Sequence, residues 1–299
     1  MDAKRFRYDT SKHWYKGNTH IHSTVSDGGL DFGALARQYA ESGFKFLFRT
    51  DHWATSGVAR DTDSYPLVWM DGVELDGVDD AGAYLHVVCL GTLSGITASM
   101  GVTAAMNAAR AQGAMIIIAH PFWSGNTFDE CIRHTPDAVE VYNHVCRWLN
   151  GKSDSHPYWQ ALLKHNPDTL ALASDDAHCM STHPGWNGGW IVINAPECTP
   201  SAIMTSIRRG NYYSSCGPDF HALEYDGSTL HVRTSPVQFL RVVGPASCGQ
   251  CYGGYGAARI TDVRVTVPQD WDYVYVEIEN EHGARAWTNT LFTASAATR

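Results

Sequence analysis

Residues 17–28 read GNTHIHSTVSDG and place two histidines two positions apart, followed by an aspartate in a Ser-Asp-Gly turn. Successive side chains of a β-strand point to opposite faces, so a strand through this segment would put His20 and His22 on the same face. Asp27 adds a carboxylate oxygen five residues beyond the second histidine. The pattern indicates ligands of a metal ion, although an isolated His-x-His pair is as often structural.

Further apolar segments predict strands, and most of them end in a histidine or an acidic residue. They are 44–49, followed by His52; 67–74, ending in Glu74; 84–90, which contains His86; 114–119, followed by His120; 137–143; and 169–173, followed by Asp176 and His178. Apolar spacing predicts helices over 31–43, 102–112 and 155–165. This alternation predicts an α/β fold with a closed parallel barrel, in which the strand ends face a common mouth.

The pattern changes near residue 215. Residues 220–233 predict a hairpin that turns at Asp226-Gly227, and further strands are predicted at 238–243, 262–267, 273–279 and 284–291, with no helix among them. We therefore predict a barrel domain over residues 1–214 and an all-β domain over residues 215–299. The second domain would pack on the barrel or serve in assembly of a homo-oligomer.

The composition bounds the classes of protein that fit. The apolar fraction of 44% in 299 residues predicts a globular protein with a substantial core, and the net charge of −9 argues against a dedicated nucleic-acid binder. No run approaches the ~18 apolar residues of a membrane span, and the polar opening residues favour a cytoplasmic location. The eight scattered cysteines favour reduced thiols, and the pair Cys248 and Cys251 is interpreted as structural.

The residues at the predicted strand ends have the chemistry of a polynuclear metal site. The candidate ligands are His20, His22, Asp27, His52, Glu74, His86, His120, Asp176 and His178. Imidazole and carboxylate in this mixture suit zinc, manganese or iron better than calcium, and the set is too large for one ion. Each residue alone also has a structural interpretation, such as an ion pair for Glu74 or a turn for Asp27.

These motifs resemble those of the PHP (polymerase and histidinol phosphatase) family of metallohydrolases. The resemblance rests on His20-Ile-His22 with Ser26-Asp-Gly28, Thr50-Asp-His52, Gly72-Val-Glu74, His86, Ala119-His-Pro121 and Ser174-Asp-Asp-Ala-His178. The β-rich end of the chain, with Arg285-Ala-Trp-Thr-Asn289, resembles the branch with a C-terminal β domain, which includes carbaryl-hydrolase-like proteins. The resemblance implies a distorted (β/α)7 barrel and a trinuclear site.

The resemblance also implies how the ligands divide among three ions. One ion would take His20, His22, Glu74 and Asp176; a second would share Glu74 and take His86 and His120; a third would take Asp27, His52 and His178. Many relatives have histidine where this chain has Asp27. Aspartate is a harder ligand, which favours manganese or iron in the third position and leaves its occupancy open. Asp175 is interpreted as a group that supports its neighbouring ligand.

The function that follows is hydrolysis of a phosphoester by a metal-activated hydroxide, with two or three divalent ions as cofactors. The catalytic group would be Glu74, Asp176 and His178, and Arg49, His144, Arg147 and His183 would contact a small, phosphorylated substrate. The main alternative is hydrolysis of an amide, carbamate or carboxylic ester at the same site. A non-catalytic metal-binding module ranks lower, and neither nucleic acid nor membrane is an expected partner.

Overall fold

The computed structural model describes residues 5–55 and 65–293 of the chain. Its helices are α1 (Phe32–Glu41), the 3-10 helix η2 (Ala98–Met100), α2 (Val102–Ala111), α3 (Pro121–Ser124), α4 (Phe128–Arg133), α5 (His144–Asn150), α6 (His156–His165) and α7 (Pro200–Arg209). Strands β1 to β9 are Arg5–Phe6, His13–Asn18, Phe46–Arg49, Val68–Val78, Tyr84–Leu90, Met115–Ile118, Ala138–Asn143, Leu170–Ser174 and Trp190–Ala195. Strands β10 to β18 are Tyr212–Ser215, Phe220–Tyr225, Thr229–Val237, Phe239–Val243, Gly249–Gly253, Ile260–Thr266, Tyr275–Glu279, Arg285–Thr288 and Phe292–Thr293.

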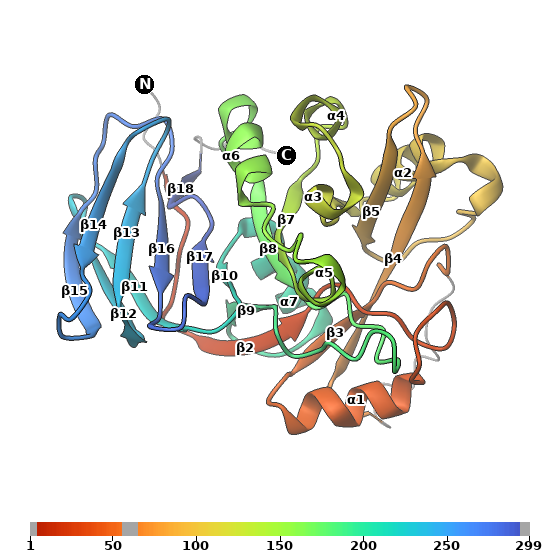
Figure 1. Cartoon of the computed structure of the whole chain (residues 1–299), viewed down its shortest axis with the longest axis horizontal. Coiled ribbons are helices and arrows are strands. Elements are labelled where there is room, and N and C mark those ends of the chain that lie inside the picture. The colour runs from red at the N-terminus through yellow and green to blue at the C-terminus, as the bar shows by residue number, and fades with distance from the viewer. Residues whose placement is uncertain (1–4, 56–64, 294–299) are drawn as a thin grey trace.

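One mixed sheet of 13 strands runs through the molecule, in the order β14-β13-β16-β17-β10-β9-β2-β3-β4-β5-β6-β7-β8 (Figure 1). Strands β2, β3 and β4 pair in parallel, as do β6, β7 and β8, whereas β5 is antiparallel to both of its neighbours. The predicted α/β class is confirmed, but the all-parallel arrangement is wrong at β5. The turn between β4 and β5, closed by Asp79 and Ala83, is too short for a parallel crossover.

Strand β8 is the last strand of this order, and its end approaches the end of β2. An isolated parallel bridge joins Ile21 to Ala177, and the backbone N–H groups of His22 and Asp176 each donate a 2.9 Å hydrogen bond across it. The side chain of Ser214 in β10 also contacts β8, accepting the N–H of Ala173 and donating to the carbonyl oxygen of Ala171. The ends of β2 and β8 therefore meet at the level of His20 and Asp176, while full barrel closure stays a prediction.

The helices cover the sheet with their apolar sides, as α1 illustrates. The side chain of Asp31 caps its first turn by accepting the N–H of Ala34 at 2.7 Å, and Leu35 and Tyr39 are buried against the apolar residues around β3. The helices predicted over 31–43, 102–112 and 155–165 are confirmed as α1, α2 and α6. Helices α3, α4, α5 and α7 were not predicted, and all but α7 are seven residues or shorter.

Beyond β10 the described chain forms strands only. The predicted hairpin is confirmed as β11 and β12, with the carboxylate of Asp226 accepting the N–H groups of Ser228 and Thr229 in its turn. Strands β13, β14, β16 and β17 belong to the large sheet, because β10 pairs with both β9 and β17. The sheet thus continues across the predicted boundary at residues 214 and 215, and a separate C-terminal domain stays a prediction.

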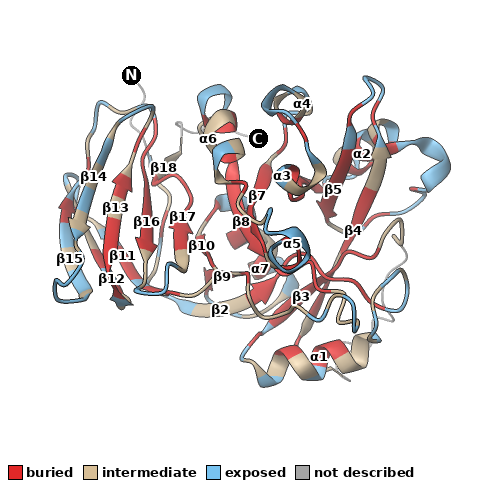
Figure 2. Ribbon diagram, viewed as in Figure 1, coloured by how far each residue is buried: buried red, intermediate tan, exposed pale blue. Residues whose placement is uncertain are grey.

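Burial follows the central strands (Figure 2). Strands β3, β6, β7, β8 and β10 are buried along their whole length, whereas β14 has no buried residue and β15 has one, Val265. Within the described ranges, no helix has the length and apolar character needed to cross a membrane. The fully buried strands place the residues at their ends on rigid supports.

Candidate metal centre

His20 and His22 lie just beyond the end of β2, and both side chains are completely buried. The regular strand ends at Asn18, so the predicted strand through both histidines is shorter than expected, but the bridge at Ile21 keeps the chain extended. The two Nε2 atoms lie 3.2 Å apart. The predicted convergence of the two imidazoles is present in the structure.

Two buried carboxylates face this pair of imidazoles. Glu74 Oε2, from β4, lies 3.1 Å from Nε2 of both histidines. Asp176 Oδ1, beyond β8, lies 3.2 Å from His20 Nε2 and 3.1 Å from His22 Nε2. The ligand atoms of these four residues lie within 4.8 Å of one another, a spacing at which they could hold one ion.

The other oxygen of Glu74 faces two more imidazoles. Its Oε1 lies 2.7 Å from Nδ1 of His86, in β5, and 3.4 Å from Nε2 of His120, at the start of α3. Glu74 therefore stands between two groups of histidines, one on each carboxylate oxygen. A carboxylate in this position can bridge two ions.

Asp27, His52 and His178 form a more exposed edge of the same cluster. Asp27 Oδ2 lies 3.2 Å from His178 Nε2 and 3.9 Å from His52 Nε2, and His52 Nε2 lies 3.4 Å from Glu74 Oε2. The side chain of Asp27 is 50% exposed. Gly28 is required beside it, because a Cβ there would lie 2.3 Å from the carbonyl oxygen of His22.

Each of these histidines has a polar neighbour on its second ring nitrogen, although the contact of His52 lacks hydrogen-bond geometry and His22 Nδ1 also lies 3.3 Å from Asp27 Oδ1. The pairs are His20 Nδ1 with Glu140 Oε1 at 2.8 Å, His22 Nδ1 with Ser26 Oγ at 3.3 Å, His52 Nδ1 with Asp76 Oδ1 at 3.0 Å, His86 Nε2 with Tyr84 OH at 3.1 Å, His120 Nδ1 with Ser124 Oγ at 3.2 Å, and His178 Nδ1 with the carbonyl oxygen of Asp176 at 2.8 Å. Such partners fix the orientation of metal-binding imidazoles in proteins.

The electrostatics of the cluster favour added positive charge. Burial raises the pKa of the Glu74 carboxyl, but the imidazoles around it, first that of His20, hold the pKa well below its ordinary value. Burial lowers the pKa of His20, but Asp176 and Glu74 raise it well above its ordinary value. In residues 5–55 and 65–293, every ion pair of Glu74, Asp176 and Asp27 is to a histidine. Neither lysine nor arginine neutralises these carboxylates there.

The ligand atoms of the cluster fit divalent metal ions, and the surroundings of one carboxylate oxygen support this interpretation. Asp176 Oδ1 is buried and has no hydrogen-bond partner among the described residues, although two imidazole nitrogens lie about 3.1–3.2 Å from it. A buried carboxylate oxygen without a donor costs free energy unless a cation lies beside it. Imidazole and carboxylate together are ligands of zinc, manganese and iron.

The four residues predicted to contact substrate lie in different surroundings. Arg49 is buried and pairs with Asp71 at 3.2 Å, which gives it a structural partner. His144 packs beneath Gly188, where an added Cβ would lie 2.0 Å from its ring. A hydrogen bond to Tyr142 raises the pKa of Arg147. Of the four, His183 is the one whose ring pairs with a cluster ring, that of His178, at 5.5 Å between centroids.

Two acidic residues of the cluster were missed from the sequence. Glu140, in β7, contacts His20, and Asp76, in β4, contacts His52. Glu140 is a single acid in the otherwise apolar segment Ala138–Tyr142, and all of that segment is buried. An acid inside a buried strand was the available signal, because it needs hydrogen-bond donors from other elements. Asp175 accepts hydrogen bonds from Asn18, Tyr39 and residues 187–189, and so supports the loop that carries the ligands.

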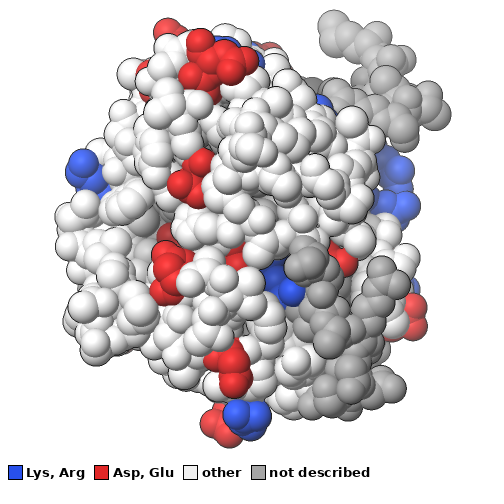
Figure 3. Space-filling model, turned by 90° about the vertical axis from the view of Figure 1, so that its right-hand side faces the viewer, with Lys and Arg blue, Asp and Glu red and all other residues white. Residues whose placement is uncertain are grey.

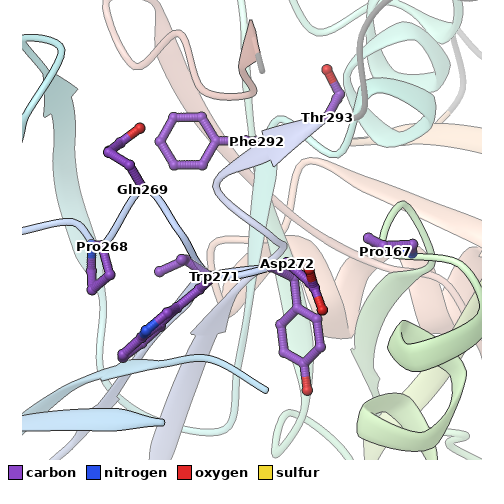
Figure 4. Close-up of a pocket in the computed structure, with 9 residues that line it drawn as sticks. Pro167, Pro268, Gln269, Trp271, Asp272, Phe292 and Thr293 are labelled. Atoms are coloured by element: carbon purple, nitrogen blue, oxygen red, sulfur yellow. The ribbon is translucent and has the colours of Figure 1, made fainter. Parts of the chain in front are cut away.

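The molecule has a small cavity away from the cluster. It has a volume of about 70 Å³ and lies between Pro167 and the C-terminal strands, lined by Trp271, Tyr273 and Phe292 among others (Figure 4). None of the candidate ligands lines it. On the face that carries β4 and β5, acidic side chains are scattered and the described basic side chains form no patch (Figure 3). The histidine and carboxylate cluster is therefore the main candidate for chemistry.

The comparisons with known proteins concern the fold. No protein-family model and no curated protein matches the sequence. A two-domain protein from Bacteroides vulgatus that contains a predicted PHP-like metal-dependent phosphoesterase is similar with a TM-score of 0.56 and 14% identity, over 95% of this chain and 96% of that one. This likeness shows that the two proteins share a fold.

Two shorter structures are similar to part of the chain. A proposed metal-dependent phosphoesterase from Bifidobacterium adolescentis has a TM-score of 0.45 and 14% identity, over 64% of this chain and 96% of its own. An amidohydrolase from Chromobacterium violaceum, with bound sulfate, has a TM-score of 0.44 and 16% identity over the same shares.

Proposed function

We propose that this chain is a metal-dependent hydrolase of phosphoesters. The observation that carries the proposal is the buried Oδ1 of Asp176, which has imidazole nitrogens around it and no hydrogen-bond donor. The PHP-like fold supports the same class of enzyme. A non-catalytic role is less consistent with a ligand cluster whose members Asp27 and His52 reach the surface.

The proposed site holds two or three ions of zinc, manganese or iron. His20, His22, Glu74 and Asp176 would hold the first ion, and Glu74, His86 and His120 the second. Asp27, His52 and His178 would hold the third. The half-exposed carboxylate of Asp27 makes the third position the most accessible to water.

Bound divalent ions would supply Lewis acidity, which makes water a nucleophile near neutral pH and stabilises charge on the substrate oxygens. The residues of the chain keep this chemistry in place. Glu74 and Asp176 are the catalytic carboxylates that face the shared centre, and His178 turns Nε2 toward the exposed edge because its Nδ1 donates to the carbonyl oxygen of Asp176. His183, whose ring lies beside that of His178, and His144 and Arg147, both in α5, are proposed to contact the substrate.

Substrate profiling of the purified protein tests the proposal. The protein would be loaded separately with zinc, manganese and iron and assayed with p-nitrophenyl phosphate and bis(p-nitrophenyl) phosphate. We expect turnover that depends on the ion and is abolished by a chelator. Absence of turnover of both phosphoesters by a protein shown to contain metal would contradict the phosphoesterase proposal.

Hydrolysis of an amide, carbamate or carboxylic ester is the second candidate, and one observation favours it. The ring of Trp123 lies 5.1 Å from that of His120, and the hydroxyl of Tyr84 contacts His86, so aromatic rather than basic side chains border this part of the site. The same preparations would be assayed with p-nitrophenyl acetate and an aryl carbamate. A kcat/KM at least about 100-fold higher than for the phosphoesters would favour this candidate.

The finer features of the architecture are proposals as well. We propose a closed (β/α)7 barrel over residues 1–214 and a C-terminal β domain over 215–299 that serves in packing or in homo-oligomer assembly. Limited proteolysis would test the boundary, and sedimentation would test the oligomer. A cytoplasmic location, with a small phosphorylated molecule as substrate, completes the proposal.

A further inference from the structure

Glu140 is a buried carboxylate whose hydrogen-bonding capacity is fully used. Its Oε1 accepts from Ser174 Oγ at 2.6 Å and from His20 Nδ1 at 2.8 Å. Its Oε2 accepts from the backbone N–H of His120 at 3.0 Å and from Asn143 Nδ2 at 2.9 Å. An ionised carboxylate offers about four lone-pair sites, so these four donors fill them.

Because its hydrogen-bonding sites are all occupied, Glu140 differs from the candidate metal ligands. His20, His120 and Glu140 lie close enough together to hold an ion on spacing alone. However, an ion at Glu140 would have to replace hydrogen bonds that are already made, whereas Asp176 Oδ1 has none to lose. The chemistry of Glu140 is therefore that of a support for other residues.

The contact with His20 decides which nitrogen of that ring carries hydrogen. Because ionised Glu140 can only accept, the hydrogen must be on His20 Nδ1. Nε2 faces Glu74 Oε2 at 3.1 Å and Asp176 Oδ1 at 3.2 Å, and its lone pair would be available to a cation held among these atoms. This is the tautomer that a metal ion at the buried centre requires.

The contact with His120 acts on the backbone. His120 has φ 28° and ψ 54°, in the left-handed region that costs free energy for a residue other than glycine. The hydrogen bond from its N–H to Glu140 Oε2 offsets part of that cost and holds the start of α3 in place. This backbone position puts His120 Nε2 3.4 Å from Glu74 Oε1.

We propose that Glu140 is the positioning residue for two of the proposed ion sites, those of His20 and His120, and that it leaves the third site unaffected. The inference rests on the metal site of the proposed function. None of the described hydrogen bonds of Glu140 reaches Asp27, His52 or His178. One side chain thus fixes a ring in one ion site and a backbone in the next.

Replacement of Glu140 by glutamine tests the inference with a change of almost equal volume. The amide has a donor where the carboxylate has an acceptor, so at least one of the four donors now faces another donor. If the amide nitrogen faces His20, the ring hydrogen moves to Nε2 and blocks that ligand position. We expect zinc affinity at two sites to fall about 10–100-fold, with the third ion retained, as measured by chelator competition and native mass spectrometry.

Nuclear magnetic resonance gives a readout that loss of stability alone would not produce. In the zinc-loaded wild-type protein, ¹⁵N spectra of the imidazoles should show hydrogen on Nδ1 of His20. Hydrogen on Nε2 in the wild-type protein would overturn the inference without any variant. In Glu140→Gln the His20 signals should change, whereas those of His52 and His178 should not.

Asp137→Asn is the matched control. Asp137 precedes β7 at the opposite end of the strand, where its carboxylate accepts the N–H of Ile116 at 2.8 Å. The Asp137→Asn substitution removes one negative charge, as Glu140→Gln does, and we expect it to leave the zinc affinity unchanged. If Glu140→Gln fails to fold, Glu140→Asp is the second variant, because it keeps the carboxylate acceptors. Its zinc affinity should be lower than that of the wild-type protein but not abolished.

The outcomes distinguish this inference from the proposed function. If the wild-type protein binds no ion, the proposed function fails, and the inference fails with it. If the wild-type protein binds ions and Glu140→Gln binds them equally well with unchanged His20 signals, only the inference is overturned. Equal losses in Glu140→Gln and Asp137→Asn would also overturn it, because both would then reflect stability.

Discussion

Histidine lies beside carboxylates both in the metal centre and at the junction between α6 and the C-terminal strands, but the two regions satisfy these carboxylates differently. At the junction, His156 Nε2 lies 2.9 Å from Tyr275 OH, and Glu277 accepts from Arg241 and from Trp287 at 2.8 Å each. None of these side-chain atoms is buried without a partner in the described structure. At the metal centre, by contrast, Asp176 Oδ1 is buried and has no hydrogen-bond partner among the described residues.

The difference lies in what compensates the negative charge. Arginine and indole donors complete the junction, so protein groups alone satisfy it. At the metal centre the described ion pairs of Glu74, Asp176 and Asp27 are all to imidazoles, which compensate the negative charge when they are protonated or when they bind a cation. A buried polar cluster that lacks lysine and arginine and leaves an oxygen without a donor therefore indicates a ligand site more strongly than histidine content does.

The sharpest way to break this comparison is to neutralise one carboxylate in each region. Glu74→Gln should lower kcat/KM by about 1,000-fold or more, because several kcal/mol of transition-state stabilisation by bound ions would be lost. Glu277→Gln should leave kcat/KM within about twofold and lower the free energy of unfolding by roughly 1–3 kcal/mol. Steady-state kinetics and urea unfolding measure the two effects. Equal kinetic losses in both variants would contradict the distinction.

Removal of metal should act on one region and leave the other unchanged. At a free ion concentration of about 100 times Kd, bound ion stabilises the folded protein by about 2.7 kcal/mol, so dialysis against a chelator should lower the melting temperature by several degrees. Glu277→Gln should show the same decrease as wild type, and Glu74→Gln a smaller one. Calorimetry with and without zinc measures this. An unchanged melting temperature in wild type would argue against a metal site.

A smaller effect is expected at the exposed edge of the metal centre. Asp27→Asn removes a carboxylate that is half exposed and can be replaced in part by water, so we expect about a tenfold loss of affinity for one ion, or ~1.4 kcal/mol. The other ions should stay bound. Titration of the metal-free protein with zinc, followed by mass spectrometry, counts them. Loss of all ions would show that the edge and the buried centre form a single cooperative site.

How far the sequence predicts this structure depends on the range of the interaction. Strand β5 matches its predicted bounds of Tyr84–Leu90, and the ligands were found because short motifs such as His20-Ile-His22 carry them. The partner of His20, Glu140, lies 120 residues away, and its local signal, an acid inside an apolar segment, does not tell which residue it contacts. Strand β9 and the pairing of β10 with β17 were not predicted for the same reason, since strand pairing depends on contacts between residues distant in sequence.

The smallest effect concerns pH and the junction. Burial lowers the pKa of His156, more than Glu277 and Asp154 raise it. The folded state thus prefers neutral His156, so its contribution to stability is present above the unfolded pKa of about 6.5 and is lost as pH falls below that value. His156→Gln cannot titrate, and its free energy of unfolding should fall less steeply than that of wild type between pH 6.5 and 5, by at most ~1.4 kcal/mol per pH unit.

Because the metal centre is the same in both proteins, its acid sensitivity cancels in the difference measured by urea unfolding at each pH. Parallel curves would mean that His156 is protonated as easily in the folded as in the unfolded protein, and the junction would then resemble the metal centre in tolerating a charged imidazole.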